Sequence, residues 1–206
     1  MQKRNPGGRK GKYTLNPKEL IEFLKILEKL KCNTRHNWTT NKRQESVAEH
    51  SWRLAVLAML MEPDFSDLDM NKVIRMCLIH DWGEAVTGDI PAFIKTENDV
   101  AVEEKATGAL LEKLPDSLKA PLSSLFEELS LMQSKEARLV KSLDKIETLI
   151  QHNEAGTDTW LPLEYELNMT YGNEICDSFP QTKKLRDQVR EDSRQLIMEE
   201  KRGNGK

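Results

Sequence analysis

Apolar positions recur along this chain with the spacing of helices. In the most informative stretch, four residues at i, i+3, i+4 and i+7 mark one helix face: Val73, Met76, Cys77 and His80. A later stretch repeats the pattern with Leu139, Leu143, Ile146 and Ile150. No run of alternating β-branched residues is long enough to form a sheet. We therefore expect an all-α fold of about seven helices.

Capping signals set the expected helix boundaries. Asn16-Pro17-Lys18-Glu19 and Ser46-Val47-Ala48-Glu49 are helix starts with capping boxes. The expected helices cover approximately residues 16–31, 46–61, 70–80, 97–114, 118–128, 134–154 and 181–200. Residues 32–45 are polar and lack periodicity, so we expect a loop there, and residues 157–180 should be irregular with short helical pieces.

The length of 206 residues fits one domain with a substantial core. We place this domain, a single helical bundle, at residues 16–200. Residues 1–15 are rich in Gly, Lys and Arg and are expected to be a flexible basic tail. Residues 201–206 are expected to be a second flexible tail.

Charge and cysteine content narrow the class of protein. The net charge is −3, and the first twelve residues carry five positive charges without an acid, so the rest of the chain is acidic. This disfavours nucleic acid as a partner. Three widely spaced cysteines fit a reducing compartment. Without a visible signal peptide or an apolar run long enough to span a membrane, we expect a soluble cytoplasmic protein.

Residues 79–91 contain the highest density of candidate catalytic and metal-binding side chains. The helix that ends near residue 80 delivers one imidazole and three carboxylates into a small volume: His80, Asp81, Glu84 and Asp89. A core rarely buries that many polar groups unless a cation or a reaction compensates them. This stretch alone also fits a core histidine that is satisfied by its neighbouring acid, so both interpretations stay open.

Two further residues at helical positions extend the set of candidate ligands. His50 lies in the first turn of the expected second helix, and Asp144 lies at the edge of the apolar stripe of the long helix. With His80 and Asp81 they offer two imidazoles and two carboxylates from three helices. Such mixed nitrogen and oxygen ligands suit Mn, Fe, Co, Ni or Zn better than Ca.

These residues match a known signature. His50, the pair His80-Asp81, and Asp144 resemble the H…HD…D pattern of HD-domain metal-dependent phosphohydrolases. The chain is most similar to the 5′-deoxynucleotidase branch, including its eukaryotic-type members. The matching segments are residues 35–38 (RHNW), 45–50 (ESVAEH), 80–91 (HDWGEAVTGDIP) and 136–145 (EARLVKSLDK). The resemblance covers about residues 17–195.

The resemblance implies a metal site. By it, the ligands of one divalent metal ion would be His50, His80, Asp81 and Asp144. Dinuclear HD proteins carry further histidines between the HD pair and the last aspartate. No histidine lies between Asp81 and Asp144 here, so we expect one metal.

The resemblance also implies roles around the metal. Glu84 and Asp89 would flank the attacking water and the phosphate, as general acid/base or water-orienting groups. Arg35 would contact the phosphate, for which its guanidinium is suited, and Trp38 would pack against the sugar. In some bacterial relatives the Arg and Trp are adjacent, whereas here two residues separate them, as in the eukaryotic-type members.

The function implied is hydrolysis of nucleoside 5′-monophosphates, with a preference for deoxy forms, by a homodimer. One alternative is an HD phosphohydrolase for another small phosphate, such as a cyclic nucleotide or an alarmone. Another is a non-catalytic HD module that binds metal or nucleotide. A degenerate module would tolerate loss of Glu84, Asp89 or Arg35, and their presence favours the enzyme.

Several remaining polar and aromatic residues have ordinary interpretations. His36 is expected to be exposed in the loop, with a substrate role as the alternative, and His152 is expected to lie at the surface. Lys141 and Lys145 are candidate phosphate contacts, although Lys145 is expected to lie on a solvated helix face. Trp52 and Trp82 are expected to be core or dimer-contact residues.

Overall fold

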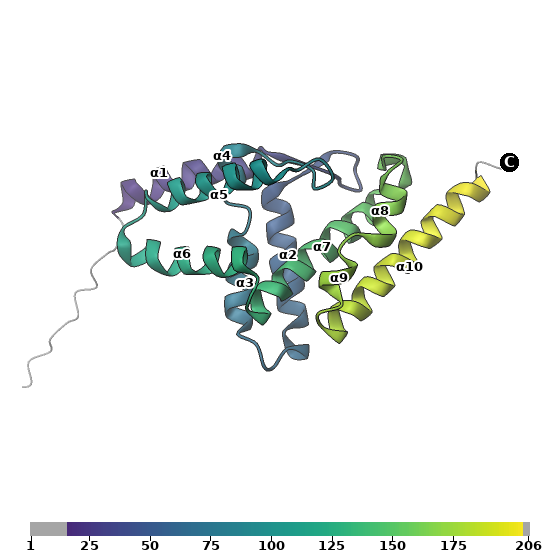
Figure 1. Ribbon diagram of the computed structural model, residues 1–206. Coiled ribbons are helices and arrows are strands. Elements are labelled where there is room, and N and C mark those ends of the chain that lie inside the picture. The colour runs from purple at the N-terminus through teal and green to yellow at the C-terminus, as the bar shows by residue number, and fades with distance from the viewer. Residues whose placement is uncertain (1–15, 204–206) are drawn as a thin grey trace, which may run out of the picture.

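The computed structural model describes residues 16–203 of the chain (Figure 1). The expected tail at residues 1–15 lies outside the described residues, as do residues 204–206. Residues 201–203 continue the last helix, three residues beyond the expected domain boundary. Within the described part, no helix is both long enough and apolar enough to cross a membrane.

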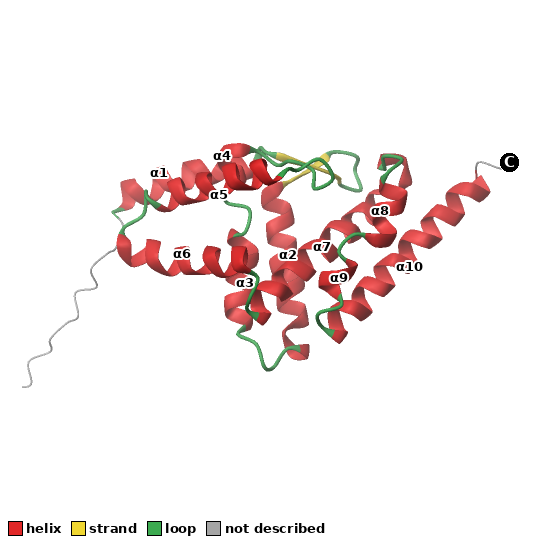
Figure 2. Cartoon of the chain, in the orientation of Figure 1, coloured by secondary structure: helices red, strands yellow, loops and turns green. Residues whose placement is uncertain are grey.

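The architecture is helical, as expected (Figure 2). Seven helices of ten or more residues correspond to the seven predicted: α1 (Pro17–Leu27), α2 (Val47–Met61), α3 (Met70–Ile79), α5 (Glu97–Leu111), α6 (Asp116–Leu131), α7 (Lys135–Ala155) and α10 (Pro180–Gly203). Short helices occupy the connections: α4 (Glu84–Thr87), α8 (Glu164–Thr170) and α9 (Asn173–Cys176). Three 3₁₀ turns add to these: Glu28–Lys31, Glu62–Asp64 and Thr157–Thr159.

Local capping explains where the helices begin. The Asn16 side chain accepts a hydrogen bond from the Glu19 backbone N–H at 2.9 Å, and the Glu19 carboxylate accepts one from the Asn16 backbone N–H. Ser46 and Glu49 form the same reciprocal pair at the start of α2. Each pair satisfies two backbone donors that the first turn of a helix leaves free. The second pair fixes the first turn of α2, which carries His50.

The centre of the molecule is the crossing of α2, α3 and α7 (Figure 1). Their facing stripes interlock in a core of fully buried side chains: Leu54, Val73, Met76, Leu139 and Leu143. Helix α6 covers this core on one side. On another side α10 packs along α7, where Val189 meets Ile146 and Leu149. The three central helices are therefore held at fixed positions, and they are the helices that carry the candidate metal ligands.

The segment expected to be a loop contains a β-hairpin, so that prediction was wrong. Strand β1 (Thr34–Trp38) pairs antiparallel with β2 (Gln44–Ser46), with an irregular register. The hairpin is fixed from outside, because Asn37 donates to the carbonyl of Thr148 on α7 at 3.0 Å and the Trp38 carbonyl accepts from Gln151 at 2.7 Å. Periodicity within 32–45 cannot show such bonds, since their partners lie more than 100 residues away.

The two tryptophans considered for the core differ. Trp82 packs against Phe23 and Phe126, with ring centroids 5.8 and 6.2 Å apart, and joins α1 to α6. Trp52 is 64% exposed on α2 and is not a core residue.

Candidate metal centre and adjoining cavity

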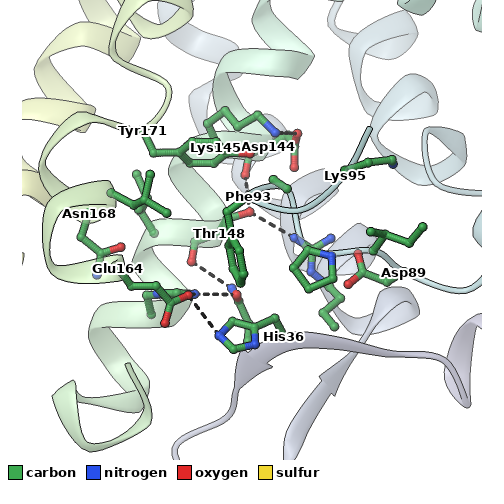
Figure 3. Close-up of a pocket in the computed structure, with 18 of the residues that line it drawn as sticks. His36, Asp89, Phe93, Lys95, Asp144, Lys145, Thr148, Glu164, Asn168 and Tyr171 are labelled. Carbon is green, nitrogen blue, oxygen red and sulfur yellow. Dashed lines mark hydrogen bonds and ion pairs between the residues drawn. The ribbon is translucent and has the colours of Figure 1, made fainter. Parts of the chain in front are cut away.

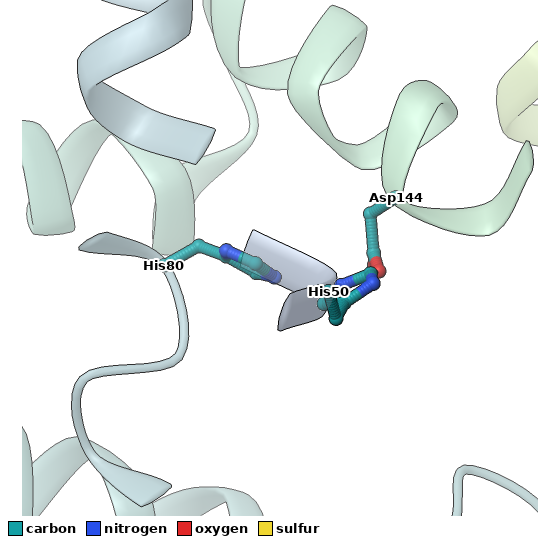
Figure 4. A group of neighbouring side chains, drawn as sticks. All are labelled: His50, His80 and Asp144. Carbon is teal, nitrogen blue, oxygen red and sulfur yellow. The ribbon is translucent and has the colours of Figure 1, made fainter. Parts of the chain in front are cut away.

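The two candidate imidazole ligands face each other at the centre of the fold. His50, in the first turn of α2, is fully buried, and His80 directly follows the last turn of α3. Their ring centroids lie 5.3 Å apart, and Figure 4 shows the His50 ring beside Asp144 of α7, with the His80 ring on its other side. Three helices that are distant in sequence therefore converge on one point.

Hydrogen bonds to Nδ1 fix how each imidazole is presented. The Cys77 carbonyl lies 2.9 Å from Nδ1 of His80, and a carbonyl only accepts, so that nitrogen carries the hydrogen. Nδ1 of His50 is bonded to the buried carboxylate of Glu147. Both Nε2 atoms are buried, and neither makes a hydrogen bond of good geometry, although a carboxylate oxygen lies close to each. Two orphaned nitrogens aimed at one point fit a metal ion, which would satisfy both.

Two carboxylates complete the group. Oδ1 of Asp144 lies 3.3 Å from Nε2 of His50, and Oδ2 of Asp81 lies 3.0 Å from Nε2 of His80 and 4.0 Å from Nε2 of His50. The structure thus brings together the four residues proposed as ligands, and their donor set fits a divalent transition metal. His50, His80 and Asp144 can present one ligand atom each within 4.8 Å of one another.

The charges of these groups suit a cation. Burial would raise the pKa of Asp144, but the neighbouring cations Lys145 and Lys141 outweigh it and hold that pKa well below its usual range. Burial and Arg35 lower the pKa of His50, yet the carboxylates of Asp144 and Glu147 dominate and raise it to about 9. A metal cation bound at Nε2 of His50 would take the place of a proton there.

Sequence reasoning missed the acidic residues behind the ligands. Glu147 is 1% exposed, and Glu45, also buried, lies close to both Glu147 and His50. Burial and the charge of Glu147 raise the pKa of Glu45 to about 7. A signal existed for Glu147, because it follows Asp144 by three residues and interrupts the apolar stripe of α7 next to Ile146.

A cavity of about 310 Å³ opens beside Asp81 and Asp144 (Figure 3). Its walls come from β1, the segment from Asp89 to Lys95, the stretch of α7 from Lys141 to His152, and α8. Basic side chains line the part near the metal ligands: Arg35, Lys95, Lys141 and Lys145. Four cations beside a candidate metal centre suit an anionic substrate.

The Arg35 guanidinium is charged and held in a fixed orientation, as a side chain that binds phosphate requires. Burial lowers its pKa, but the carboxylates of Asp81, Asp144 and Asp89 outweigh burial and raise it. Its Nη1 lies 3.5 Å from Oδ2 of Asp81, and its Nη2 donates to Thr148 Oγ1 at 3.2 Å. The guanidinium is thus oriented and charged at the mouth of the metal site.

Lys145 does not lie on a solvated face, so that prediction was wrong. Its side chain is largely buried, with Nζ 3.1 Å from Oδ2 of Asp144 and 4.9 Å from the centre of the Tyr171 ring. The close approach needs Gly172, because a Cβ there would lie 2.7 Å from Cβ of Lys145. The phosphate contact considered as the alternative remains a proposal.

Glu84 and Asp89 both line the cavity. Gly88 adopts a φ of +77°, which ends α4 and turns the chain toward Asp89. Burial, followed by the carboxylates of Asp81 and Asp89, raises the pKa of Glu84 to about 10. Burial also raises the pKa of Asp89, partly opposed by Arg35. Glu84 is therefore protonated at neutral pH and can donate a proton.

Trp38 is not among the described residues that line the cavity. It ends β1, and its carbonyl is held by Gln151. The structure brings Arg35 to the cavity but not the indole three residues further on.

The other two histidines line the cavity, although His152 was expected at the surface and His36 was expected to be exposed, with a substrate role as the alternative. His36 and His152 contact the buried Glu164, whose Oε1 lies 3.1 and 3.5 Å from their Nε2 atoms. His152 lies two turns beyond Asp144 on the same face of α7, a spacing that could have indicated its place.

Comparison with known proteins identifies the family of this chain. The HD domain family profile matches residues 27–183 of the chain. The human 5′-deoxynucleotidase HDDC2 is 36% identical over 141 residues, covering 66% of this chain and 68% of the human protein. The *Dictyostelium discoideum* 5′-deoxynucleotidase HDDC2 is 31% identical, covering 64% of this chain and 74% of that protein. The chain therefore belongs to the HD domain family.

A solved structure supports the fold. The crystal structure of a predicted metal-dependent phosphohydrolase from *Magnetospirillum magnetotacticum* matches with a TM-score of 0.72 at 25% identity. The match covers 88% of this chain and 95% of the bacterial one. A conserved hypothetical protein from *Pyrococcus furiosus* matches with a TM-score of 0.57 at 28% identity, covering 84% of this chain and 99% of that one.

Proposed function

We propose that this chain is a metal-dependent 5′-deoxynucleotidase, which hydrolyses nucleoside 5′-monophosphates, preferentially deoxy forms, to nucleoside and phosphate. The observation that carries the proposal is the pair of buried, unpartnered Nε2 atoms of His50 and His80 beside a cavity lined by cations. The relatives named 5′-deoxynucleotidase support the choice of substrate.

His50, His80, Asp81 and Asp144 are the proposed ligands of one divalent ion, with Mn, Co, Fe, Ni or Zn as candidates. A bound ion of this kind activates water and neutralises phosphate charge. Glu147 and the Cys77 carbonyl keep the two imidazoles turned toward it.

The chain's own groups account for the remaining steps. Arg35, already oriented by Thr148, donates hydrogen bonds to the phosphate oxygens. Glu84 is protonated and gives its proton to the 5′-oxygen of the sugar as the P–O bond breaks. Asp89, beside Arg35, accepts a proton from the attacking water or orients it. Lys141 and Lys145 add positive charge on the α7 side.

Trp38 is the proposed contact for the sugar. Because the indole does not line the cavity in this structure, its side chain or the hairpin would have to move for it to meet C2′. Trp38→Ala should then narrow the gap in kcat/KM between deoxy and ribo substrates. An unchanged ratio would assign Trp38 to support of the hairpin alone.

The direct test is phosphate release from a panel of nucleoside monophosphates, cyclic nucleotides and alarmones with each divalent metal in turn. We expect metal-dependent release from deoxynucleoside 5′-monophosphates, and loss of both metal retention and release in Asp81→Ala. Release from the cyclic nucleotides or alarmones alone would overturn the proposed substrate, and release that needs no metal would overturn the proposed centre.

We further propose that the chain forms a homodimer in the cytoplasm and has no nucleic acid partner. Val86 and Val102 are half exposed and line a shallow groove between α4 and α5, and Trp52 is also exposed, so apolar surface is available for a second copy. The three cysteines, all in the described residues, are unpaired, which suits a reducing compartment. Sedimentation that shows only a 23.7 kDa species at micromolar concentration would contradict the dimer.

A further inference from the structure

The cavity has a second polar end, away from the metal ligands. Figure 3 shows Asp144 and Lys145 at one end, Glu164 and His36 at the other, and Phe93 and Thr148 between them. Helix α7 runs along the cavity with Asp144 and His152 eight residues apart, which is about 12 Å at 1.5 Å per residue. A molecule whose phosphate is bound at the proposed metal centre, beside Asp144, therefore has room to extend toward His152.

The hydrogen bonds at this second end determine which ring nitrogen of His152 carries a hydrogen. Asn37 donates from Nδ2 to the Thr148 carbonyl at 3.0 Å, so its Oδ1 is an acceptor. Nε2 of His152 lies 2.7 Å from that oxygen and donates to it. Burial is the main reason why the pKa of His152 falls to about 4, so the ring is neutral at pH 7. Its Nδ1 is then an acceptor, buried and without a partner.

Helix α8 supplies a carboxylate and an amide at the same end. Glu164 and Asn168 are four residues apart on one face of α8 and are 2% and 1% exposed. Oε2 of Glu164 accepts from the Leu161 backbone N–H at 2.7 Å, and its Oε1 faces His36 and His152. Nδ2 of Asn168 is buried and has no partner. A buried amide donor without a partner in a cavity wall points to a ligand.

The walls around these polar groups are flat or apolar. The Phe93 ring meets the His36 ring edge-on, with centroids 5.4 Å apart. Leu149 of α7 and Leu167 of α8 line the same cavity. Apolar walls with a few convergent polar groups are typical of small-molecule sites.

We propose that His36, His152, Glu164 and Asn168 form a base subsite, which binds the nucleobase of the substrate through hydrogen bonds. The Glu164 carboxylate accepts from an N–H of the base, and the Asn168 amide donates to the neighbouring carbonyl oxygen or ring nitrogen. Adenine, guanine, cytosine and thymine each present an N–H next to an acceptor, so each can be bound. This inference rests on the proposed nucleotidase function and adds that the base, as well as the phosphate, is recognised.

The test compares three substrates that share a sugar phosphate. They are 2′-deoxyadenosine 5′-monophosphate, its analogue with unsubstituted purine as the base, and 2-deoxyribose 5-phosphate, which has no base. The purine analogue keeps the ring but lacks the exocyclic N–H. A hydrogen bond to a charged group is worth about tenfold or more, so we expect the wild type to have a kcat/KM lower by at least about tenfold for both analogues, chiefly through KM.

Glu164→Gln tests the residue itself. Glutamine can still accept from the Leu161 N–H, so the start of α8 is kept, while the charge is lost. We expect kcat/KM for the deoxyadenosine substrate to fall about tenfold through KM, and the value for deoxyribose 5-phosphate to stay unchanged. Glu166→Gln, on the exposed side of the same helix, is the matched control and should change neither value.

The outcomes separate this inference from the proposed function. Equal kcat/KM for all three substrates in the wild type would overturn the base subsite and leave the nucleotidase standing, and this comparison needs no variant to fold. Equal loss on all substrates in Glu164→Gln would also overturn it, because the residue would then only support the fold. Hydrolysis of none of the three with any divalent metal would instead overturn the proposed function.

Discussion

The contacts of His50 orient its imidazole ring so that Nε2 can bind a cation. Its Nδ1 is bonded to the carboxylate of Glu147, and its Nε2 faces Asp144. A carboxylate behind a metal-binding imidazole fixes the ring and makes it a better ligand. Glu147 therefore acts through His50 and is a positioning residue.

Glu147→Gln should weaken binding of the divalent metal by about tenfold, because the amide supports the imidazole with less charge. Metal titration of the metal-free protein measures the change. Glu154→Gln is the matched control, since Glu154 also contacts Arg53 but is exposed and distant from His50. Unchanged affinity in Glu147→Gln would mean that the carboxylate contributes packing alone.

Glu84 and Asp89 are expected to act in turnover without holding the metal. Glu84→Gln or Asp89→Asn should keep bound metal and lower kcat by about 10²-fold or more, the usual size of general acid/base effects. Metal content and kcat are measured on the same samples. The exposed Glu97→Gln on α5 serves as control. Wild-type turnover in both amide variants would make the two carboxylates structural.

At the level of elements, α7 and the α8–α9 turn are held close by one glycine. Gly172 has a φ of +73°, and a Cβ there would lie 2.7 Å from Cβ of Lys145. The turn carries Tyr171, whose ring covers the Lys145 ammonium, and its carbonyl accepts from the buried Arg186 of α10 at 3.1 Å. One wall of the cavity thus depends on this contact.

Gly172→Ala should lower the free energy of unfolding by about 1–2 kcal/mol, the cost of a left-handed conformation for an L-residue, with a further loss from the clash with Lys145. Chemical denaturation measures the change. Gly108→Ala is the control, because a Cβ at that position of α5 meets nothing within 4 Å, and it should be neutral or stabilising. Equal stability of Gly172→Ala and wild type would show that the turn relaxes freely.

For the whole molecule, the buried groups of the cavity link stability to pH. The pKa of His152 falls from its ordinary 6.5 to about 4, chiefly through burial. Between these values the unfolded chain binds a proton that the folded chain does not, so stability is lost as pH falls through this window. Outside the cavity lining, burial of Glu45 beside Glu147 acts in the opposite direction, since its pKa is raised to about 7.

His152→Gln isolates the histidine contribution, because glutamine can still donate to Asn37. We expect the wild type to lose more stability than the variant as the pH falls from 6.5 to 4, with the two curves parallel above 7. Urea denaturation at each pH gives the curves. Curves that stay parallel from pH 7 to 4 would show that the pKa of His152 is the same in the folded and the unfolded protein.

The helical architecture could be predicted because its causes are local. Capping pairs such as Ser46 with Glu49, and apolar stripes such as that of α7, act within a few residues. The motif around His80 also lies in one short segment, so its candidate ligands could be named before their positions were known.

Tertiary structure alone decided the rest of the site. The hairpin depends on bonds such as Asn37 to Thr148, 111 residues apart, and no pattern within residues 32–45 indicates them. Lys145 and His152 were expected at the surface, because both are polar residues on a helix. They are buried because another element, α8 and its following turn, covers them, and the helix sequence does not indicate that cover. The helices and the ligand-bearing motifs could be predicted because they follow from neighbouring residues. The cavity and its second end arise from the packing of distant segments.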